Sequence, residues 1–233
     1  MKRLLTFILA LAFISCSIPE HRRNSIEFPV SSFLQINHRV FFKACKNEEK
    51  ACKETRSLIK ASGFVLTGRS SKRKEGSIGV TAGHACDLTD HKVSPHRSII
   101  KVSMIGGAVY KANILKVYPD ADICILRING VKLPGIRLSK SKPKRGDRAF
   151  TMAAPYGIFS EEMVLLLDGY YSGRDPRSLD VYTVPAKPGS SGSPILNWKA
   201  EVIGITSMAA IHFEHLTLSP NYESVRDILR HYE

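Results

Sequence analysis

Short apolar runs separated by turn-forming residues dominate the hydrophobic pattern of this chain of 233 residues. The runs are rich in β-branched and aromatic residues, and no period of 3.6 residues extends through them, which is the pattern of strands. In the first half the pattern predicts strands that include Arg39–Lys43 and Gly63–Thr67, with a polar loop around Lys46 to Ala51. About six strands are expected in each half, and such numbers favour two packed antiparallel barrels.

The end of the chain has a different pattern. Apolar side chains recur at helical spacing after Pro220, and either Ser219 or Asn221 can cap the first turn. The predicted fold class is therefore all-β, with two six-stranded antiparallel barrels and a short C-terminal helix. We expect the N-terminal barrel over 32–135 and the C-terminal barrel with the helix over 136–233.

The first residues are predicted to be a targeting segment. Lys2 and Arg3 precede the apolar run Leu4 to Ile14, which is too short to span a bilayer and is typical of a signal peptide over 1–16. Its end resembles a bacterial lipobox, in which Cys16 would be lipidated; the alternative is an ordinary signal peptide with a chance cysteine. A linker over 17–31 would follow. The protein is thus expected to be exported, and either periplasmic, anchored in a membrane as a lipoprotein, or secreted.

Composition and charge restrict the partners. The formal net charge is +13, and the positive residues gather in Arg69 to Lys74 and Lys140 to Arg148. The simplest interpretation is that both segments are solvated loops; the alternative is attraction to an anionic membrane or cell-wall surface. No nucleic-acid partner is expected, because the basic residues are not interleaved with aromatic ones.

Four cysteines remain after the predicted cleavage. In an oxidising compartment they allow three pairings. Cys45 and Cys52 flank a short polar loop and could form a local bridge, whereas Cys86 and Cys124 could pair or pack as small apolar side chains.

Three segments have the residues that serine-based hydrolysis requires. They are Thr81-Ala82-Gly83-His84, Asp120-Ala121-Asp122 before an apolar run, and Gly189-Ser190-Ser191-Gly192. A serine needs a neighbouring base to attack a carbonyl, the base needs a carboxylate to orient it, and the resulting oxyanion needs N–H donors. The order of histidine, aspartate and serine is that of the chymotrypsin template and not of the α/β-hydrolases.

These segments resemble the motifs of the chymotrypsin/trypsin superfamily, and most closely those of bacterial HtrA-like protease domains. Ser62-Gly63-Phe64, Ala154-Pro155-Tyr156-Gly157 and Val202-Ile203-Gly204-Ile205 resemble further motifs in family order. The resemblance implies a serine endopeptidase that acts on protein or peptide substrates without cofactor or metal. No PDZ domain is expected after the helix, so the regulated assembly of HtrA proteins is not implied. The resemblance assigns catalysis to His84, Asp122 and Ser191, and the oxyanion hole to N–H groups of Gly189 and Ser191. The implied substrate pocket comprises Ala186, Lys187, Pro188, Thr206, Ser207 and Met208.

Several alternatives stay open at the level of sequence. Asp120 competes with Asp122, and Ser190 and Ser193 compete with Ser191, although the motif register favours Asp122 and Ser191. The pocket segments contain no acidic residue, so we expect a small or apolar side chain before the scissile bond; Lys187 would instead favour an acidic one. The chief alternative function is a catalytically silent binding or adhesion module on the same fold, and a second is an esterase or acyltransferase.

Overall fold

The computed structural model describes the whole chain except residues 1–25, 46–51, 69–75, 89–94, 211–212 and 214. The predicted signal peptide with Cys16, most of the predicted linker and the basic loop after Gly68 therefore lie outside the described residues. Within the described part, no helix is long and apolar enough to cross a membrane.

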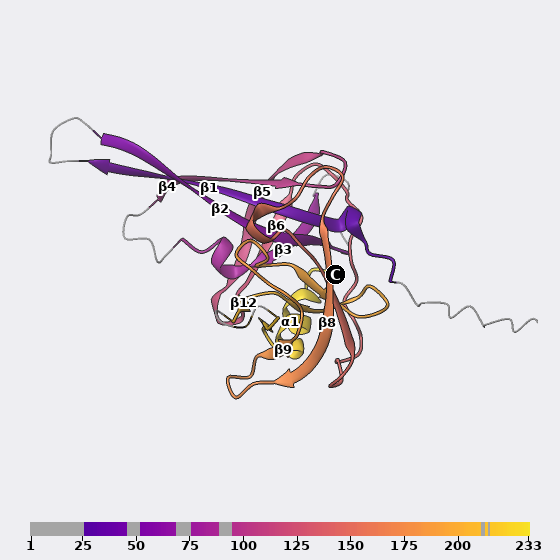
Figure 1. Cartoon of the computed structure of the whole chain (residues 1–233). Helices are drawn as coiled ribbons and strands as arrows, with labels where there is room; N and C mark the ends of the chain where they lie inside the picture. The colour runs from indigo at the N-terminus through magenta and orange to yellow at the C-terminus, as the bar shows by residue number, and fades with distance from the viewer. Residues whose placement is uncertain (1–25, 46–51, 69–75, 89–94, 211–212, 214) are drawn as a thin grey trace, which may run out of the picture.

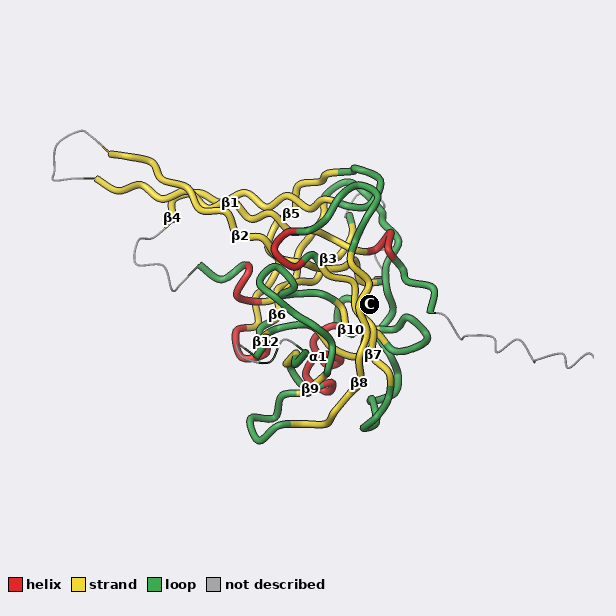
Figure 2. The backbone as a smooth tube through the Cα atoms, viewed as in Figure 1, coloured by secondary structure: helices red, strands yellow, loops and turns green. Residues whose placement is uncertain are grey.

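The first half folds into a closed antiparallel barrel, which Figures 1 and 2 show in the upper part of the molecule. Its inward positions are mainly apolar, with His38 as a buried polar exception; Leu34, Val102 and Leu126 are each completely buried. The strands follow the order β1-β2-β3-β6-β5-β4 around the barrel. Their bounds are β1 Phe33–Cys45, β2 Cys52–Leu66, β3 Ser77–Ala82, β4 Pro95–Ser103, β5 Val109–Tyr118 and β6 Ile123–Ile128.

The β1–β2 hairpin extends well beyond the barrel (Figure 1). Its register is continuous from Phe33 opposite Phe64 to Cys45 opposite Cys52. The sequence predicted the loop between these cysteines, but it missed the first part of β2, because charged residues on both sides of the hairpin hide the alternation. The side chains of Cys45 and the following loop lie outside the described part, so a bridge to Cys52 stays a prediction.

The second half forms a seven-stranded sheet in the order β11-β10-β7-β8-β9-β13-β12. The all-β fold class with two strand units and a C-terminal helix is confirmed. The second unit differs in detail from a six-stranded barrel, because its described strands number seven and form a curled open sheet. The strands are β7 Arg148–Ala153, β8 Leu165–Arg174, β9 Asp180–Tyr182, β10 Pro194–Leu196, β11 Val202–Ile205, β12 Met208–Ala209 and β13 Thr217–Ser219.

One core joins the two units. Phe33, Phe64 and Ile123 from the barrel pack in the same cluster as Met152 and Leu196 from the second sheet. The cluster also receives Val225 and Leu229 of helix α1 (Tyr222–Leu229), so the helix closes the second sheet and contributes to the shared core. Because apolar burial is the main stabilising term, this shared core fixes the two units against each other.

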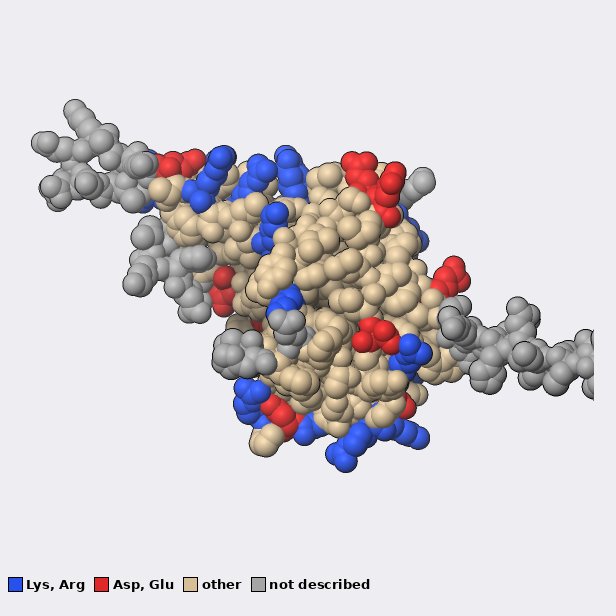
Figure 3. All heavy atoms as spheres, in the orientation of Figure 1, with Lys and Arg blue, Asp and Glu red and all other residues tan. Residues whose placement is uncertain are grey.

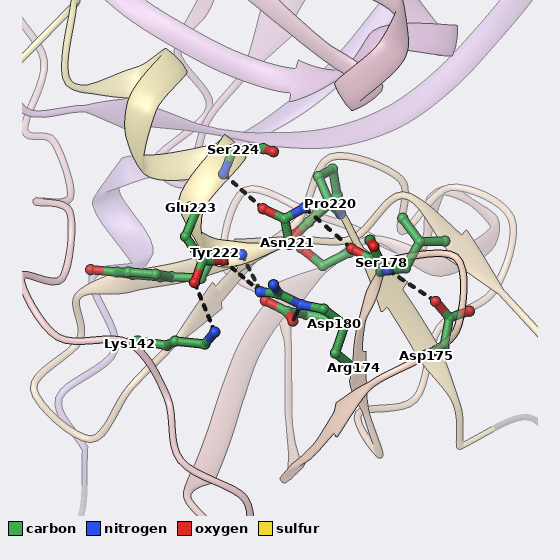
Figure 4. A network of polar contacts seen from close by, with 12 residues as sticks. Lys142, Arg174, Asp175, Ser178, Asp180, Pro220, Asn221, Tyr222, Glu223 and Ser224 are labelled. Carbon is green, nitrogen blue, oxygen red and sulfur yellow. Dashed lines mark hydrogen bonds and ion pairs between the residues drawn. The ribbon is translucent and has the colours of Figure 1, made fainter.

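A buried polar network holds the start of α1 (Figure 4). The carboxylate of Asp180, which is completely buried, accepts hydrogen bonds from Arg174 Nε at 3.0 Å and from the Tyr222 N–H at 2.6 Å. Asn221 caps the helix by accepting from the Ser224 N–H at 2.9 Å, as one of the two predicted caps. Hydrogen bonds from Lys142 and Arg174 to Glu223 lower the pKa of that carboxyl to about 2.

Candidate active site

His84 lies in a tight turn that follows β3. The turn covers Gly83–Ala85, and the Gly83 N–H donates to the carbonyl oxygen of Asp122 at 2.8 Å. A Cβ atom at position 83 would lie 2.9 Å from the Asp122 carbonyl carbon, which is too close for any side chain. The glycine before His84 therefore permits the two backbones to approach and places the imidazole beside Asp122.

Asp122 stands at the mouth of β6, at the same end of the barrel as His84. Its backbone is left-handed, with φ 46° and ψ 46°, and Ile123 directly after it pairs with Ala82 of β3. Asp122 Oδ1 accepts from the His84 backbone N–H at 2.8 Å. The His84 ring nitrogen Nδ1 lies 3.0 Å from both carboxylate oxygens, which leaves the other ring nitrogen, Nε2, for chemistry.

The electrostatics of this pair suit a histidine base. The hydrogen bond to Asp122 raises the pKa of His84 above 6.5, against the opposing effect of burial. Burial by itself would raise the pKa of Asp122, but hydrogen bonds from His84 and Ser207 outweigh it and lower that pKa below its usual value. Asp122 is thus ionised at neutral pH, where it orients the imidazole and stabilises its protonated form.

A disulfide fastens the segments of these two residues. Cys86 and Cys124 are bonded, with their Cα atoms 6.3 Å apart. Each cysteine comes two residues after His84 or Asp122, so the bond joins the His84 turn to β6. Of the alternatives that the sequence left open, pairing is the one that the structure shows.

Ser191 lies in a turn of the second half between two glycines with positive φ, Gly189 at 98° and Gly192 at 87°. At position 192 a Cβ atom would meet the Ser62 carbonyl oxygen at 2.3 Å. Only glycine fits such a backbone and such a close approach. The turn therefore holds Ser191 directly against β2 of the barrel, whose Ser62 N–H donates to the Ser191 carbonyl oxygen at 2.9 Å.

A cavity of about 490 Å³ opens beside Ser191. The structure brings all six residues of the predicted substrate pocket to its wall, together with Tyr156, Ala209 and Ala210. None of these lining residues is acidic. A second cavity of about 470 Å³ contains His84 and Asp122, and the two cavities share Ser207 and Met208.

The side chains of His84 and Ser191 form no hydrogen bond with each other among the described residues. Such contacts are often long without substrate and tighten when it binds. Among the described residues, the backbone N–H groups of Gly189 and Ser191 likewise donate no hydrogen bond. The structure therefore places the predicted catalytic residues around two cavities that share Ser207 and Met208.

Two further residues, Ser207 and Ser62, make contacts at the site that the sequence did not predict. Ser207, predicted only as a pocket wall, donates from Oγ to Asp122 Oδ2. Ser62, completely buried, donates from Oγ to the Gly189 carbonyl at 2.8 Å and accepts from the Ala154 N–H at 3.0 Å. Ser62 had a signal, because it begins the motif Ser62-Gly63-Phe64, but its contacts depend on residues about a hundred positions away.

Metal ligation has no support in the described residues, where no three His, Cys, Asp or Glu side chains gather as a metal site would require.

The chain is similar to known proteins in sequence and in fold. Residues 61–205, more than half of the chain, match the model of the trypsin-like peptidase domain. The chain belongs to this family. This trypsin-like domain is 24% identical over 198 residues to a DegP-like probable periplasmic serine endoprotease of Chlamydia trachomatis, with 81% of the chain and 36% of the relative covered. A relative of the same description from Pseudomonas fluorescens is 28% identical over 200 residues, with coverage of 82% and 38%.

Solved structures agree on the fold of the trypsin-like domain. The crystal structure of the serine endoprotease from Yersinia pestis superposes with a TM-score of 0.63 at 17% identity, and covers 87% of this chain and 62% of its own. The chain spans little more than a third of the length of the two curated relatives. The resemblance to the HtrA-like branch of the superfamily is confirmed.

Proposed function

We propose that this trypsin-like domain is an exported serine endopeptidase that hydrolyses peptide bonds through an acyl-enzyme at Ser191. The observation that supports this most is the His84–Asp122 pair, which borders the cavity system that contains Ser191. A silent binding module would not require an imidazole whose Nδ1 is held by a carboxylate and whose Nε2 is left for proton transfer. Membership of the peptidase family points in the same direction.

In the proposed reaction His84 Nε2 removes the proton from Ser191 Oγ as that oxygen bonds to the scissile carbonyl carbon. The carbonyl oxygen becomes an oxyanion, which the N–H groups of Gly189 and Ser191 stabilise. His84 then gives its proton to the leaving amine and the C–N bond breaks. In the second half His84 activates water, which releases the acyl group and restores Ser191. No cofactor takes part.

The substrate is proposed to be a protein or peptide with a small or apolar side chain before the scissile bond. The cavity beside Ser191 is walled by Ala186, Pro188, Met208, Ala209 and Ala210 and presents no carboxylate to a basic side chain. Export is proposed from the apolar run after Arg3 and from the periplasmic description of the relatives. Anchoring through Cys16 remains part of this proposal.

A fluorophosphonate probe tests the proposal, because it labels only a serine that a neighbouring base activates. Labelling is expected for the wild type and for Ser57→Ala, an exposed control on β2, and not for Ser191→Ala or His84→Ala. Cleavage of a peptide library and of ester substrates by unlabelled wild type then separates peptidase from esterase activity. Absence of labelling in correctly folded wild type would favour the binding module, and cleavage of esters alone would favour the esterase.

A further inference from the structure

The outer face of the first barrel has an unusual charge pattern where β2, β1, β4 and β5 lie side by side. Residues directly opposite each other in an antiparallel sheet share a face. In one row Lys60 lies opposite Asn37, Asn37 opposite Lys101, and Lys101 opposite Lys111. The next row on this face adds Arg39, and the row after it adds Arg56 and Arg97. The basic face consists of Arg39, Arg56, Lys60, Arg97, Lys101 and Lys111, and Figure 3 shows several Lys and Arg side chains over this part of the molecule.

These six cations are not neutralised within the described part of the chain. None of them forms an ion pair with a described carboxylate, and Arg97 instead stacks on the Phe41 ring at 4.1 Å. The acidic residue in the next row, Glu54, contacts His96 at 3.2 Å. The basic face is therefore a surface to which an acidic ligand would be attracted.

The same strand offers free backbone groups. Pairing between β2 and β3 begins at Gly63, so the earlier part of β2 has only β1 beside it among the described strands. The Ser62 N–H points away from β1 to Ser191. Because strand directions alternate with a period of two, Lys60, Leu58 and Arg56 direct their N–H and C=O groups to the same free edge. Such an edge can bind an added strand.

This edge continues directly from the candidate active site. Lys60 is two residues from Ser62, and its side chain lies over Gly157, where a Cβ atom would meet Lys60 Cδ at 3.0 Å. Gly157 follows Tyr156 of the cavity wall. The cavity for the residue before the scissile bond is lined by the second half alone, whereas β2 reaches Ser191 from the barrel. The free edge is thus suited to the residues after the scissile bond.

We propose that the basic face selects acidic residues in the substrate segment that follows the scissile bond, where this segment lies antiparallel along the free edge of β2. The inference rests on the proposed function. A polypeptide fits better than an anionic bilayer, because a bilayer would leave the backbone groups of the edge unused. The direction also fits, since β2 runs towards Ser191 while the bound segment would run away from it.

Matched peptides test this inference. They share every residue up to the second after the scissile bond, and from the third onward have either glutamates or lysines alternating with serine. The value of kcat/KM for the acidic peptide is expected to exceed that for the basic peptide about five- to tenfold at low salt, because several exposed charge pairs of modest strength combine. The ratio is expected to fall at high salt through screening. Moving the glutamates before the scissile bond is expected to abolish the preference.

Charge-reversal variants test whether the basic face causes the preference for acidic peptides. The double variant Arg56→Glu/Lys60→Glu is expected to lose or invert the acidic preference, and Arg39→Glu/Arg97→Glu serves as a second variant should the first fold poorly. The matched control Lys140→Glu/Lys144→Glu, in the exposed connection between the two units, is expected to retain the wild-type ratio. N-methylation of alternate nitrogens in the acidic segment is expected to weaken cleavage, because it removes donors to the β2 edge.

The outcomes separate the two proposals. If no peptide is cleaved in a Ser191-dependent way, the proposed function fails. If peptides are cleaved but acidic and basic segments give equal kcat/KM, or the reversed variant keeps the wild-type ratio, the inference alone is overturned. It is also overturned if the reversed variant only loses binding to phosphatidylglycerol vesicles, since the basic face would then serve a membrane.

Discussion

The two halves of the molecule hold their parts of the candidate site by different means. In the barrel, His84 and Asp122 follow paired strands, and the Cys86–Cys124 disulfide fixes their segments together. In the second half, Ser191 lies in a turn with glycines of positive φ, between strands β9 and β10 of only three residues each. The proposed base and its carboxylate thus depend on regular sheet, whereas the proposed nucleophile depends on turn geometry and on contacts across the interface.

Ser62 connects the two halves at the candidate site. Its backbone belongs to the barrel, but its N–H and hydroxyl bind the Ser191 and Gly189 carbonyl groups of the other half. These two contacts hold the turn that contains Ser191 against the barrel. Five experiments test whether the two halves hold their parts of the candidate site in these different ways.

The largest loss of activity is expected from substitution of the proposed catalytic residues, which come from both halves. Ser191→Ala and His84→Ala should each lower kcat by about 10⁴-fold or more, because the two act as one unit. The double variant should be hardly worse than either single variant. Steady-state kinetics on one peptide substrate measure this, and additive losses would show that the halves act independently.

Second in size is the buried network of the second half. Asp180→Asn is expected to destabilise the fold by about 3 kcal/mol, because a neutral amide weakens the hydrogen bonds that the completely buried carboxylate accepts from Arg174, Tyr171 and the Tyr222 N–H. Thermal and denaturant unfolding measure the loss. Asp168→Asn is the matched control: its ion pair with Arg148 is exposed, so it should cost less than about 1 kcal/mol. Equal losses would contradict the role of burial.

Removal of the Cys86–Cys124 disulfide tests how the barrel holds its part of the site. Replacement of Cys86 and Cys124 by alanine is expected to cost about 3 kcal/mol of unfolding free energy, because the bond closes a loop between residues 38 positions apart. Activity at low temperature should fall less than in the catalytic variants, since β3 and β6 still pair. Unchanged stability would show that the sheet alone holds His84 beside Asp122.

Removal of the Ser62 hydroxyl should act across the interface. Ser62→Ala leaves the Gly189 carbonyl and the Ala154 N–H without their partner, and we expect kcat to fall about 10- to 100-fold with little change in KM. Ser57→Ala, on the exposed part of the same strand, should change kcat less than about twofold. A change in KM alone would assign Ser62 to substrate binding.

The smallest effect is a shift of the pH profile. Only neutral His84 is a base, and its pKa is raised above 6.5 by Asp122, so kcat/KM should rise with pH through a midpoint above 6.5. The same shift implies that protonated His84 stabilises the fold at acidic pH, and that this contribution is lost as pH rises through the folded pKa. A midpoint at or below 6.5 would contradict the orienting contact.

Much of this organisation was predictable from local patterns. The helix after Asn221, several strands of the barrel and the three segments that contain His84, Asp122 and Ser191 are marked by residues that are neighbours in sequence. The first part of β2 was not predicted, because Glu54, Arg56 and Lys60 are exposed and no apolar alternation marks it. The open second sheet was equally hidden, since strands of two or three residues have too few positions to show a period.

The contacts of Ser62 and Ser207 could not be predicted from the chain alone. Each binds a partner on the other unit, and the pairing exists only once the shared core has formed. The choice between bonded and merely packed Cys86 and Cys124 was open for the same reason. Sequence patterns specify elements and chemistry, whereas the distances that make a site arise from tertiary packing.

The unpaired edge of β2 also has a bearing on how copies of this protein behave at high concentration. A long exposed strand would ordinarily recruit an identical strand and start aggregation. Here two such edges would bring Arg56 and Lys60 of both molecules together, and the repulsion between like charges opposes that association. The same side chains that we expect to attract acidic segments thus keep neighbouring molecules apart, which predicts good colloidal stability that is lost first in concentrated salt.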